Sequence, residues 1–394
     1  MSGFGRALLP LWALDPEITY LNHGTVGATP RRVLAAQQAI RDEIQRQPAR
    51  YLIRELADVK QIEMRARPRM RVAADAVAEF VGARGDDLAF VDNATAGLNA
   101  VLRSLRFAAG DEILLTDHGY GSVPNIARHA ATPAGARVVT VELPHPRWEA
   151  GAIVEAIAGA LTPRTRLAIV DHVTSPTALV LPVAEIVARC HAAGVPVLVD
   201  GAHAPGAIAL DVPALGADWY TGNLHKWAMA PVSSGFLWAP PERQAGLHPA
   251  VISWGYELGF AAEFDLLGTR DPSAWLAAPE GIAFMRDLGL EAMREWNHRL
   301  AWGSARLLAD RWGVELPQVE AMVGTMVSMP QPARFGTTAA DATRLKDALL
   351  YEDGVEAQVL AFRDGLLWRI SAQVYNEPAD VERAARAIER RARG

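Results

Sequence analysis

Short hydrophobic runs occur along much of the chain and alternate with segments whose apolar residues recur at helical spacing. Such runs, separated by helices, predict a mostly parallel β-sheet covered on both faces. In these sheets ligands bind beyond the carboxyl ends of the strands, so the residues that follow each run are the first candidates for a site. The six runs are residues 87–91, 111–117, 137–143, 166–172, 195–200 and 234–240.

Helix signals flank this region on both sides. Thr29 and Pro30 predict a helix start, with a capping hydroxyl and a proline at the first helical position, and the helix is expected to end before Pro48. A second helical stretch is expected over residues 55–82. Later in the chain the pattern predicts a long amphipathic helix, two short strands and a charged helix, at residues 280–312, 322–329, 366–372 and 378–393.

These elements predict an α/β protein with a large domain, whose mixed sheet is mostly parallel, and a smaller α+β C-terminal domain. The expected divisions are an N-terminal arm at residues 1–25 that packs on the small domain, a large domain at 26–270 and a small domain at 271–394. Residues 7–14 are apolar but contain Pro10 and lead into acidic residues. They are therefore interpreted as part of the arm and not as a signal peptide.

The composition narrows the class of protein. Of the 394 residues 50% are hydrophobic, and the net charge is −6 with no basic patch, so no nucleic-acid partner is expected. The one cysteine, Cys190, excludes an intramolecular disulfide and a cysteine-rich zinc site, and it fits a reducing compartment. No apolar stretch approaches the roughly 20 residues that span a membrane. A cytoplasmic protein without membrane association is expected.

Polar residues follow the first two hydrophobic runs. Asn93, Ala94 and Thr95 begin a helix after the first run, where free backbone N–H groups suit a phosphate. The alternative is that Asn93 or Thr95 only caps the helix. His118 follows the second run, where an ordinary loop histidine is the alternative.

The later runs are followed by groups of a different kind. Asp200 ends the fifth run and precedes His203. A carboxylate there is costly to bury unless it meets a positive group such as a pyridinium nitrogen; a solvated turn residue is the alternative. Lys226 lies between Leu224 and Trp227. An apolar setting lowers the pKa of a lysine, as a Schiff-base lysine requires, whereas most lysines are solvated surface charges.

In this order, these groups resemble the class V aminotransferase family of fold-type-I pyridoxal-phosphate (PLP) enzymes. The resemblance runs through nearly the whole chain and is strongest at NATAGLN (93–99), VDGAH (199–203) and NLHKW (223–227). The segment YLNHGTVGATP (20–30), together with NLHKW, is most similar to the isopenicillin N epimerase branch. The resemblance implies PLP as the cofactor and a small amino acid as the substrate.

The resemblance also implies a role for each matching residue. Lys226 would hold PLP as a Schiff base, Asp200 would pair with the pyridinium nitrogen, and His118 would stack on the ring. His203 would lie near the phenolic oxygen of the cofactor. Ser175 would stand near that oxygen, at the position where the resemblance to desulfurases implies an asparagine.

The phosphate and the subunit contact are implied in the same way. Thr95 and the backbone of Ala94 would bind the phosphate, and Asn223 and His225 would complete its binding site. Thr269 would reach the phosphate of a neighbouring subunit, which implies a homodimer with shared sites.

Arg369 would bind the substrate carboxylate, and Asn22 and His23 would contribute to substrate binding. Epimerisation would also need a second acid or base on the face of the substrate opposite the lysine. The candidates are His23, Tyr256 and Tyr375, each with a purely structural role as the alternative.

The implied reaction begins at Cα and ends in epimerisation or transamination. A cysteine-independent C–S lyase, acting by β-elimination on a sulfur-containing amino acid, is an alternative. A persulfide-forming desulfurase is disfavoured because no cysteine follows Cys190, which shares an apolar helix face with Val183 and Ile186. Two other classes stay open: a non-catalytic binding protein on the same fold, and a metal-dependent enzyme. No metal is expected, since histidine-rich ligand spacing is absent.

Overall fold

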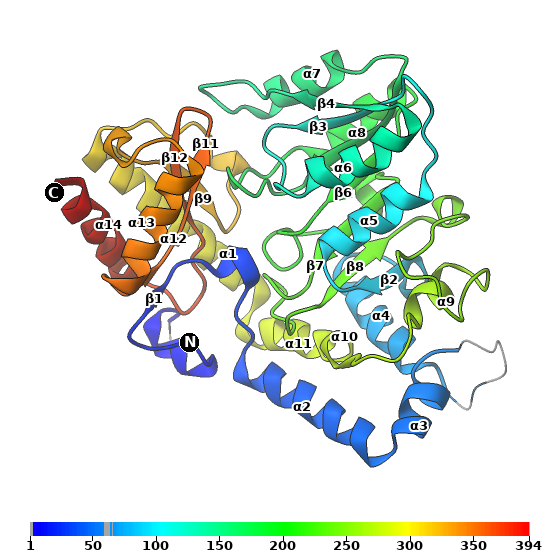
Figure 1. Cartoon of the computed structure of the whole chain (residues 1–394). Coiled ribbons are helices and arrows are strands. Elements are labelled where there is room, and N and C mark those ends of the chain that lie inside the picture. The colour runs from blue at the N-terminus through cyan, green and yellow to red at the C-terminus, as the bar shows by residue number, and fades with distance from the viewer. Residues whose placement is uncertain (1–2, 59–63, 65, 394) are drawn as a thin grey trace.

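The computed structural model describes residues 3–58, 64 and 66–393, and a seven-stranded β-sheet lies at its centre (Figure 1). The strand order is β2-β8-β7-β6-β5-β3-β4. β8 is antiparallel to both neighbours, and the other six strands run in one direction. The predicted fold class, with a mostly parallel mixed sheet, is confirmed. The strands are β2 (Leu88–Val91), β3 (Glu112–Thr116), β4 (Arg137–Val141), β5 (Thr165–Asp171), β6 (Val197–Asp200), β7 (Trp219–Asn223) and β8 (Gly235–Trp238).

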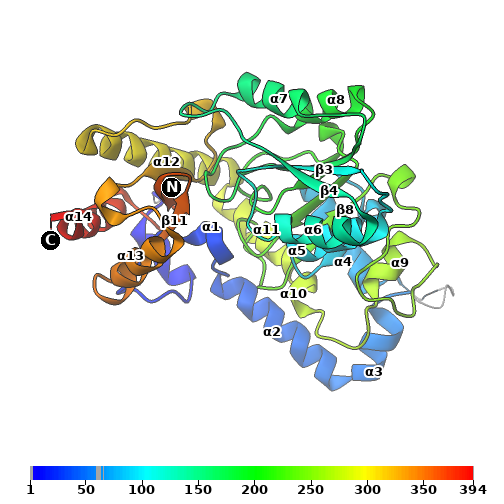
Figure 2. The ribbon, with the colours of Figure 1, turned by 45° about the horizontal axis from the view of Figure 1, so that its top comes forward.

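Helices cover both faces because each strand sends alternate side chains to opposite sides. In β5, Leu167 and Ile169 pack in one core with α5, α6 and α9. Ala168 and Val170 pack in a second core with α4, α7, α8 and α11. Figures 1 and 2 show α5 and α6 on one side of β3 and β4, and α7 and α8 on the other. The helices of this unit are α2 (Arg31–Arg46), α3 (Pro48–Arg50), α4 (Arg69–Phe80), α5 (Ala94–Ser104), α6 (Val123–Ala131), α7 (Ala150–Gly159), α8 (Val183–Ala192), α9 (Phe260–Asp265), α10 (Ser273–Leu276) and α11 (Ala278–Leu288).

The strand β7 was not predicted from the sequence. Its residues WYTGN end in two turn-favouring types, Gly222 and Asn223, so the apolar pattern is too short to indicate a strand. Gly222 is needed there because a Cβ would lie 2.7 Å from the ring of Phe236 and 2.9 Å from the side chain of Pro205. Packing between neighbouring segments therefore outweighs the local preference.

Two helix starts differ from the prediction. Pro30 is extended and lies outside the helix, which begins at Arg31, and the hydroxyl of Thr29 donates to the backbone of Ala230 instead of capping it. In the described part of the stretch predicted over 55–82, Glu55 ends a π-helix that begins at Tyr51, and Arg69–Phe80 forms α4. The proline that precedes Arg69 disfavours helix in the residue before it. Residues 59–63 and 65 of that stretch lie outside the described residues.

The predicted helix over 280–312 is two helices, α11 and α12 (Leu290–Trp312). Gly289 separates them with φ +90°, a conformation that favours glycine. The helices α10 and α11 pack against α2 and α4. The chain after residue 270 therefore first completes the large unit, and the packing of the small unit begins with α12.

The small unit has its own core around a three-stranded antiparallel sheet in the order β11-β12-β9. The predicted strand at 366–372 is β12 and the predicted charged helix is α14, whereas β11 was not predicted. The strand predicted at 322–329 begins later, because Glu320–Met322 forms a 3-10 turn. The elements are β9 (Val327–Pro330), α13 (Ala339–Tyr351), β10 (Val355–Glu356), β11 (Gln358–Phe362), β12 (Gly365–Ile370) and α14 (Pro378–Arg393).

The N-terminal segment connects the two units. It begins with a 3-10 helix, Arg6–Leu11, and β1 (Thr19–Tyr20) pairs in parallel with β10. The short helix α1 (His23–Val26) then leads to Gly27, where any Cβ would collide with the backbone carbonyl of His225. This close approach brings residues 23–27 beside the loop that carries Lys226. No helix of the described chain has the length and apolar character needed to cross a membrane.

Candidate active site

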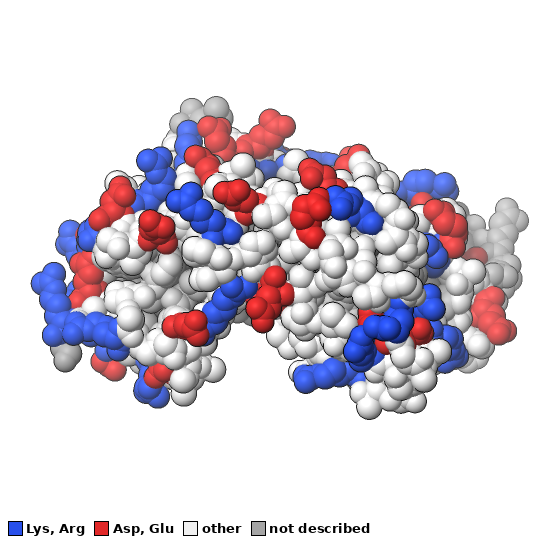
Figure 3. All heavy atoms as spheres, turned by 90° about the horizontal axis from the view of Figure 1, so that it is seen from above, with Lys and Arg blue, Asp and Glu red and all other residues white. Residues whose placement is uncertain are grey.

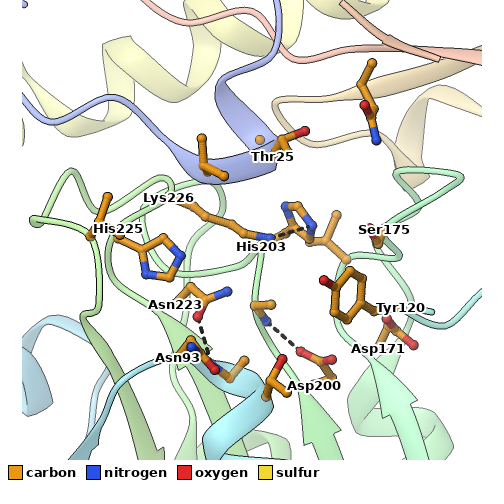
Figure 4. A pocket seen from close by; sticks show the side chains of 18 of the residues that line it. Thr25, Asn93, Tyr120, Asp171, Ser175, Asp200, His203, Asn223, His225 and Lys226 are labelled. Carbon is orange, nitrogen blue, oxygen red and sulfur yellow. Dashed lines mark hydrogen bonds between the residues drawn. The ribbon is translucent and has the colours of Figure 1, made fainter. Parts of the chain in front are cut away.

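A cavity of about 340 Å³ lies where the carboxyl ends of β2, β5, β6 and β7 meet (Figure 4). Strands that run in the same direction end at the same edge of the sheet, which brings together groups far apart in the sequence. Nine residues predicted from the sequence line this cavity: Ala94, Thr95, Ser175, Asp200, His203, Asn223, His225, Lys226 and Arg369. The four others, Asn22, His23, His118 and Thr269, do not.

Lys226 lies in the loop after β7, with 8% of its surface exposed. Its Nζ is 3.1 Å from Nε2 of His203. Burial lowers the pKa of Lys226 to about 7, the charge of Arg369 lowers it as well, and Asp200 opposes them. Burial, with the charge of Lys226, also holds the pKa of His203 well below its usual value. A large share of the lysine amine is therefore unprotonated, and nucleophilic, at neutral pH.

Asp200 ends β6 and is paired in register with Asp171, the last residue of β5. Asp200 accepts one hydrogen bond from the backbone N–H of Ala202, at 3.0 Å. Burial raises the pKa of Asp200, while the Ala202 N–H and Lys226 oppose the rise. Burial, and then the charge of Asp200, raise the pKa of Asp171 well above its usual value. The sequence analysis missed Asp171, although an acidic residue at the end of an apolar run was the signal that identified Asp200.

The start of α5 forms another end of the cavity. Asn93 caps this helix, because its Oδ1 accepts the backbone N–H of Ala96 at 3.0 Å. The N–H of Ala94 donates to Oδ1 of Asn223 at 2.8 Å, and Thr95 lines the cavity beside it. The capping alternative therefore describes Asn93 and not Thr95. An anion held here would meet the positive end of the helix dipole.

Arg369 extends from β12 of the small unit and is almost completely buried. It donates to the backbone oxygen of Ser175 at 2.7 Å and to Oγ1 of Thr25 at 2.8 Å. Burial lowers its pKa to about 10, which leaves it charged. No carboxylate of the described residues forms an ion pair with it, and its Nε has no hydrogen-bond partner among them. A buried cation of this kind suits a carboxylate brought by a ligand.

Asn22 does not line the cavity, so its contact with substrate stays a prediction. Its amide donates to Oε1 of Glu356 at 2.7 Å and its Oδ1 accepts the hydroxyl of Thr25. Thr25 in turn accepts from Arg369. Asn22 is therefore linked to Arg369 through Thr25, a cavity residue that the sequence analysis missed.

His23 and the other candidates for a second acid or base also lie outside the cavity. His23 is fully buried, with Nε2 donating to the backbone oxygen of Lys226 and Nδ1 3.0 Å from the hydroxyl of Tyr375. Tyr375 is buried as well, and Tyr256 packs beside His248. His23 therefore supports the lysine loop, and none of the three predicted groups faces the cavity.

His118 also lies outside the lining of the cavity, so its stacking on the cofactor stays a prediction. Its ring is fully buried and meets the rings of Trp148 and Phe362 edge-on, at 82° and 79°. Its Nδ1 is 2.8 Å from Oγ1 of Thr177. Burial lowers the pKa of His118 to about 4, so the ring is neutral. Packing against these aromatic rings draws the imidazole into the interior, which its position after a strand did not reveal.

Thr269 lies apart from the cavity, in a shallow pocket lined by Leu52, Ile53 and Gly268. It makes no contribution to the cavity of its own chain. Its predicted contact with a phosphate therefore depends on a second copy of the chain.

The fold and this arrangement at the strand ends define a PLP-dependent enzyme of fold type I. The chain belongs to the aminotransferase class-V family, which matches residues 19–383. Its cofactor is pyridoxal 5'-phosphate.

Known relatives extend this comparison. The chain is 35% identical to isopenicillin N epimerase of Streptomyces clavuligerus over 394 aligned residues, which cover 95% of each chain. It is 33% identical to a probable chloroplastic L-cysteine desulfhydrase of Arabidopsis thaliana, over 95% of this chain and 83% of that one.

Solved structures share the fold at lower identity. The apo cysteine desulfurase of Thermococcus onnurineus NA1 has a TM-score of 0.79 and 20% identity, and the match covers 100% of this chain and 99% of that one. A cystine C–S lyase, C-DES, has a TM-score of 0.75 and 23% identity over 94% and 97% of the two chains. Both likenesses bear on the fold alone.

The residues present fit PLP. Nδ1 of His203 is buried without a hydrogen-bond partner in the described chain, and Asp200 is a buried carboxylate at the floor of the cavity. PLP offers a partner for each of these groups. Its protonated ring nitrogen suits the Asp200 carboxylate, its anionic ring oxygen suits His203, and its phosphate suits the start of α5.

Proposed function

We propose that this PLP enzyme removes the α-proton of a small amino acid, with Lys226 first as the covalent anchor of the cofactor and then as the base. One observation carries the proposal: the Lys226 amine is buried, its pKa is lowered to about 7, and it shares a cavity with the unpaired cation Arg369. The cavity of about 340 Å³ lies within the range of about 300–1,000 Å³ for ligand sites.

The cofactor would be held by groups from several strand ends. When bound, PLP supplies an electron sink that stabilises negative charge at Cα. Asp200 would face the ring nitrogen, and His203 and Ser175 would face the phenolic oxygen. The phosphate would lie against the start of α5, at Ala94, Thr95, Asn223 and His225.

The chain's own groups would then orient the substrate. Arg369 would bind its carboxylate through two parallel hydrogen bonds, while Thr25 and the backbone of Ser175 fix the plane of the guanidinium. His23 would fix the backbone of Lys226, so that the amine meets the α-proton at a constant position. Lys226 would accept this proton and hold it for return to the substrate or the cofactor.

The leading proposal for the complete reaction is an epimerase or aminotransferase of the isopenicillin N epimerase type, which the 35% identical relative supports. A C–S lyase that works by β-elimination is the second candidate, supported by the desulfhydrase relative. Burial raises the pKa of the Cys190 thiol to about 11, and Cys190 lies on α8 outside the cavity. A lyase of this fold would therefore work without a persulfide on cysteine.

A single assay distinguishes these outcomes. The purified holoenzyme is incubated in deuterium oxide with individual L-amino acids, including cysteine, cystine and amino acids with longer side chains. We expect deuterium at Cα without loss of ammonia, and with inversion if the enzyme is an epimerase. Release of pyruvate and ammonia from cysteine or cystine would instead identify the lyase, and a keto acid with aminated cofactor would identify transamination. Absence of exchange and of every product would contradict proton removal by Lys226.

We further propose a homodimer in the cytoplasm, in which Thr269 reaches the neighbouring site. Val251, Ile252 and Trp254 are more than half exposed, and Trp254 reaches 77%. A contiguous apolar segment of this kind fits an interface. Figure 3 shows acidic and basic side chains interspersed over one face, without a continuous basic patch. Sedimentation of the purified protein is expected to give twice the 42.5 kDa chain mass, and a monomer would contradict the shared site.

A further inference from the structure

Tyr120 is an unexplained aromatic residue at the cavity. It lies in the loop between β3 and α6, two positions after His118, and 47% of its surface is exposed. Figure 4 shows its ring beside Asp171 and Asp200, with the hydroxyl end directed into the cavity. Of the described residues that line the cavity, it is the one with a phenyl or indole type of ring.

The loop that carries Tyr120 is fixed from both sides. Asp117 accepts the backbone N–H of Leu143 at 2.9 Å and a guanidinium N–H of Arg363 at 2.7 Å. The Asp171 carboxyl is hydrogen-bonded to the backbone of Tyr120. A Cβ at Gly119 would lie 3.3 Å from Asp171, so the loop lies directly on that strand end. The backbone of Tyr120 is therefore held against the end of β5, the strand that also places Asp171 beside Asp200.

A planar cofactor whose nitrogen contacts Asp200 exposes the face of its ring, and an aromatic side chain can stack on that face. Aromatic rings in contact prefer an offset-stacked or an edge-to-face arrangement. The His118 ring packs edge-on against Trp148 and Phe362, and it is hydrogen-bonded to Thr177. It would have to leave these contacts to stack on the cofactor. Tyr120 lines the cavity, and its ring makes no aromatic contact of this kind with the residues that the structure describes.

We propose that Tyr120, and not His118, is the aromatic group that covers the pyridine ring of the cofactor. This inference rests on the proposed binding of PLP at Lys226 and Asp200. It makes Tyr120 a cofactor-binding residue, and His118 a structural residue that supports the same loop from behind.

The test measures cofactor binding and does not depend on turnover. PLP is removed from wild-type, Tyr120→Leu, Tyr120→Phe and His118→Gln proteins, and each is titrated with PLP while circular dichroism is recorded in the cofactor's absorption band. Loss of an aromatic stack is expected to weaken PLP binding by about threefold to tenfold in the leucine variant and to change the induced dichroism. The phenylalanine variant keeps the ring and is expected to stay within about twofold of the wild type. Thermal unfolding of the cofactor-free proteins verifies that each variant is folded.

The outcomes separate the two proposals. Unchanged affinity and dichroism in Tyr120→Leu would overturn the role of Tyr120, as would a spectral loss confined to His118→Gln in folded protein. Wild-type protein that takes up no PLP would overturn the proposed function itself. Binding at Lys226 with an unaffected leucine variant would leave the proposed function intact and remove only this inference.

Discussion

Replacing Lys226 by alanine is expected to abolish the covalent bond to PLP and to lower turnover by at least about 10²–10⁴-fold, since the variant lacks both anchor and base. Borohydride treatment of the wild type should fix the cofactor on a single peptide. The chain has three lysines, Lys60, Lys226 and Lys346, so peptide mapping is unambiguous. Lys346→Ala is the matched control and should keep full labelling. Borohydride-fixed label on a lysine other than Lys226, or label fixed on the Lys226→Ala protein itself, would contradict the assignment.

The lowered pKa of this amine predicts how uptake of PLP depends on pH. The amine attacks the aldehyde only when unprotonated, and it loses its proton as pH rises through its pKa, which burial places at about 7. The rate of PLP uptake by cofactor-free protein should therefore rise about tenfold between pH 6 and pH 8 and then level off. An ordinary solvated lysine would instead give a rate that keeps rising beyond pH 9. Stopped-flow absorbance with the wild type distinguishes the two curves.

Replacing Arg369 by glutamine is expected to lower kcat/KM for amino acids by about 10²–10⁴-fold. Two charge-assisted hydrogen bonds of roughly 1.5–3 kcal/mol each would be lost, and each 1.36 kcal/mol is a factor of ten. The effect should depend on the substrate's carboxylate. An amine that lacks this group should react about equally slowly with both forms of the enzyme.

Arg344→Gln is the control for this experiment, since Arg344 is an exposed arginine of the same unit. Arg369→Lys keeps the charge but not the two parallel bonds and should recover only part of the activity. A loss of the same size on amines without a carboxylate would show that Arg369 acts on the fold and not on the substrate. Far-ultraviolet dichroism of each variant excludes simple unfolding.

The sequence predicted most of the site because strand ends carry a strong pattern. Hydrophobic runs located the carboxyl edge of the sheet, and the polar residues just beyond it, such as Asp200, are cavity residues. The resemblance to the class-V family then gave each of them a role. Lys226 could be identified although it follows a strand that the pattern missed, because the motif NLHKW does not depend on that strand.

The misses share a physical cause, since they depend on contacts between distant segments. His118 and Tyr120 stand two positions apart on one loop, and only the aromatic rings that pack from other elements decide which of them faces the cavity. Asn22 and Thr25 also lie on one short segment, where Glu356 engages the first and Arg369 the second. Periodicity within a segment contains no information on these partners.

The connection through α1 has a consequence for how the enzyme folds. The hydrogen bond between His23 and the backbone of Lys226 joins residues 203 positions apart, and that between Thr25 and Arg369 joins residues 344 positions apart. Closing such long loops is slow compared with forming local structure. A chain still on the ribosome cannot complete the guanidinium contact until Arg369 has been synthesised. A site that both binds the cofactor and positions Arg369 for substrate therefore forms late in folding. Its formation requires that the segment of residues 23–25 has already packed against Lys226 and Arg369.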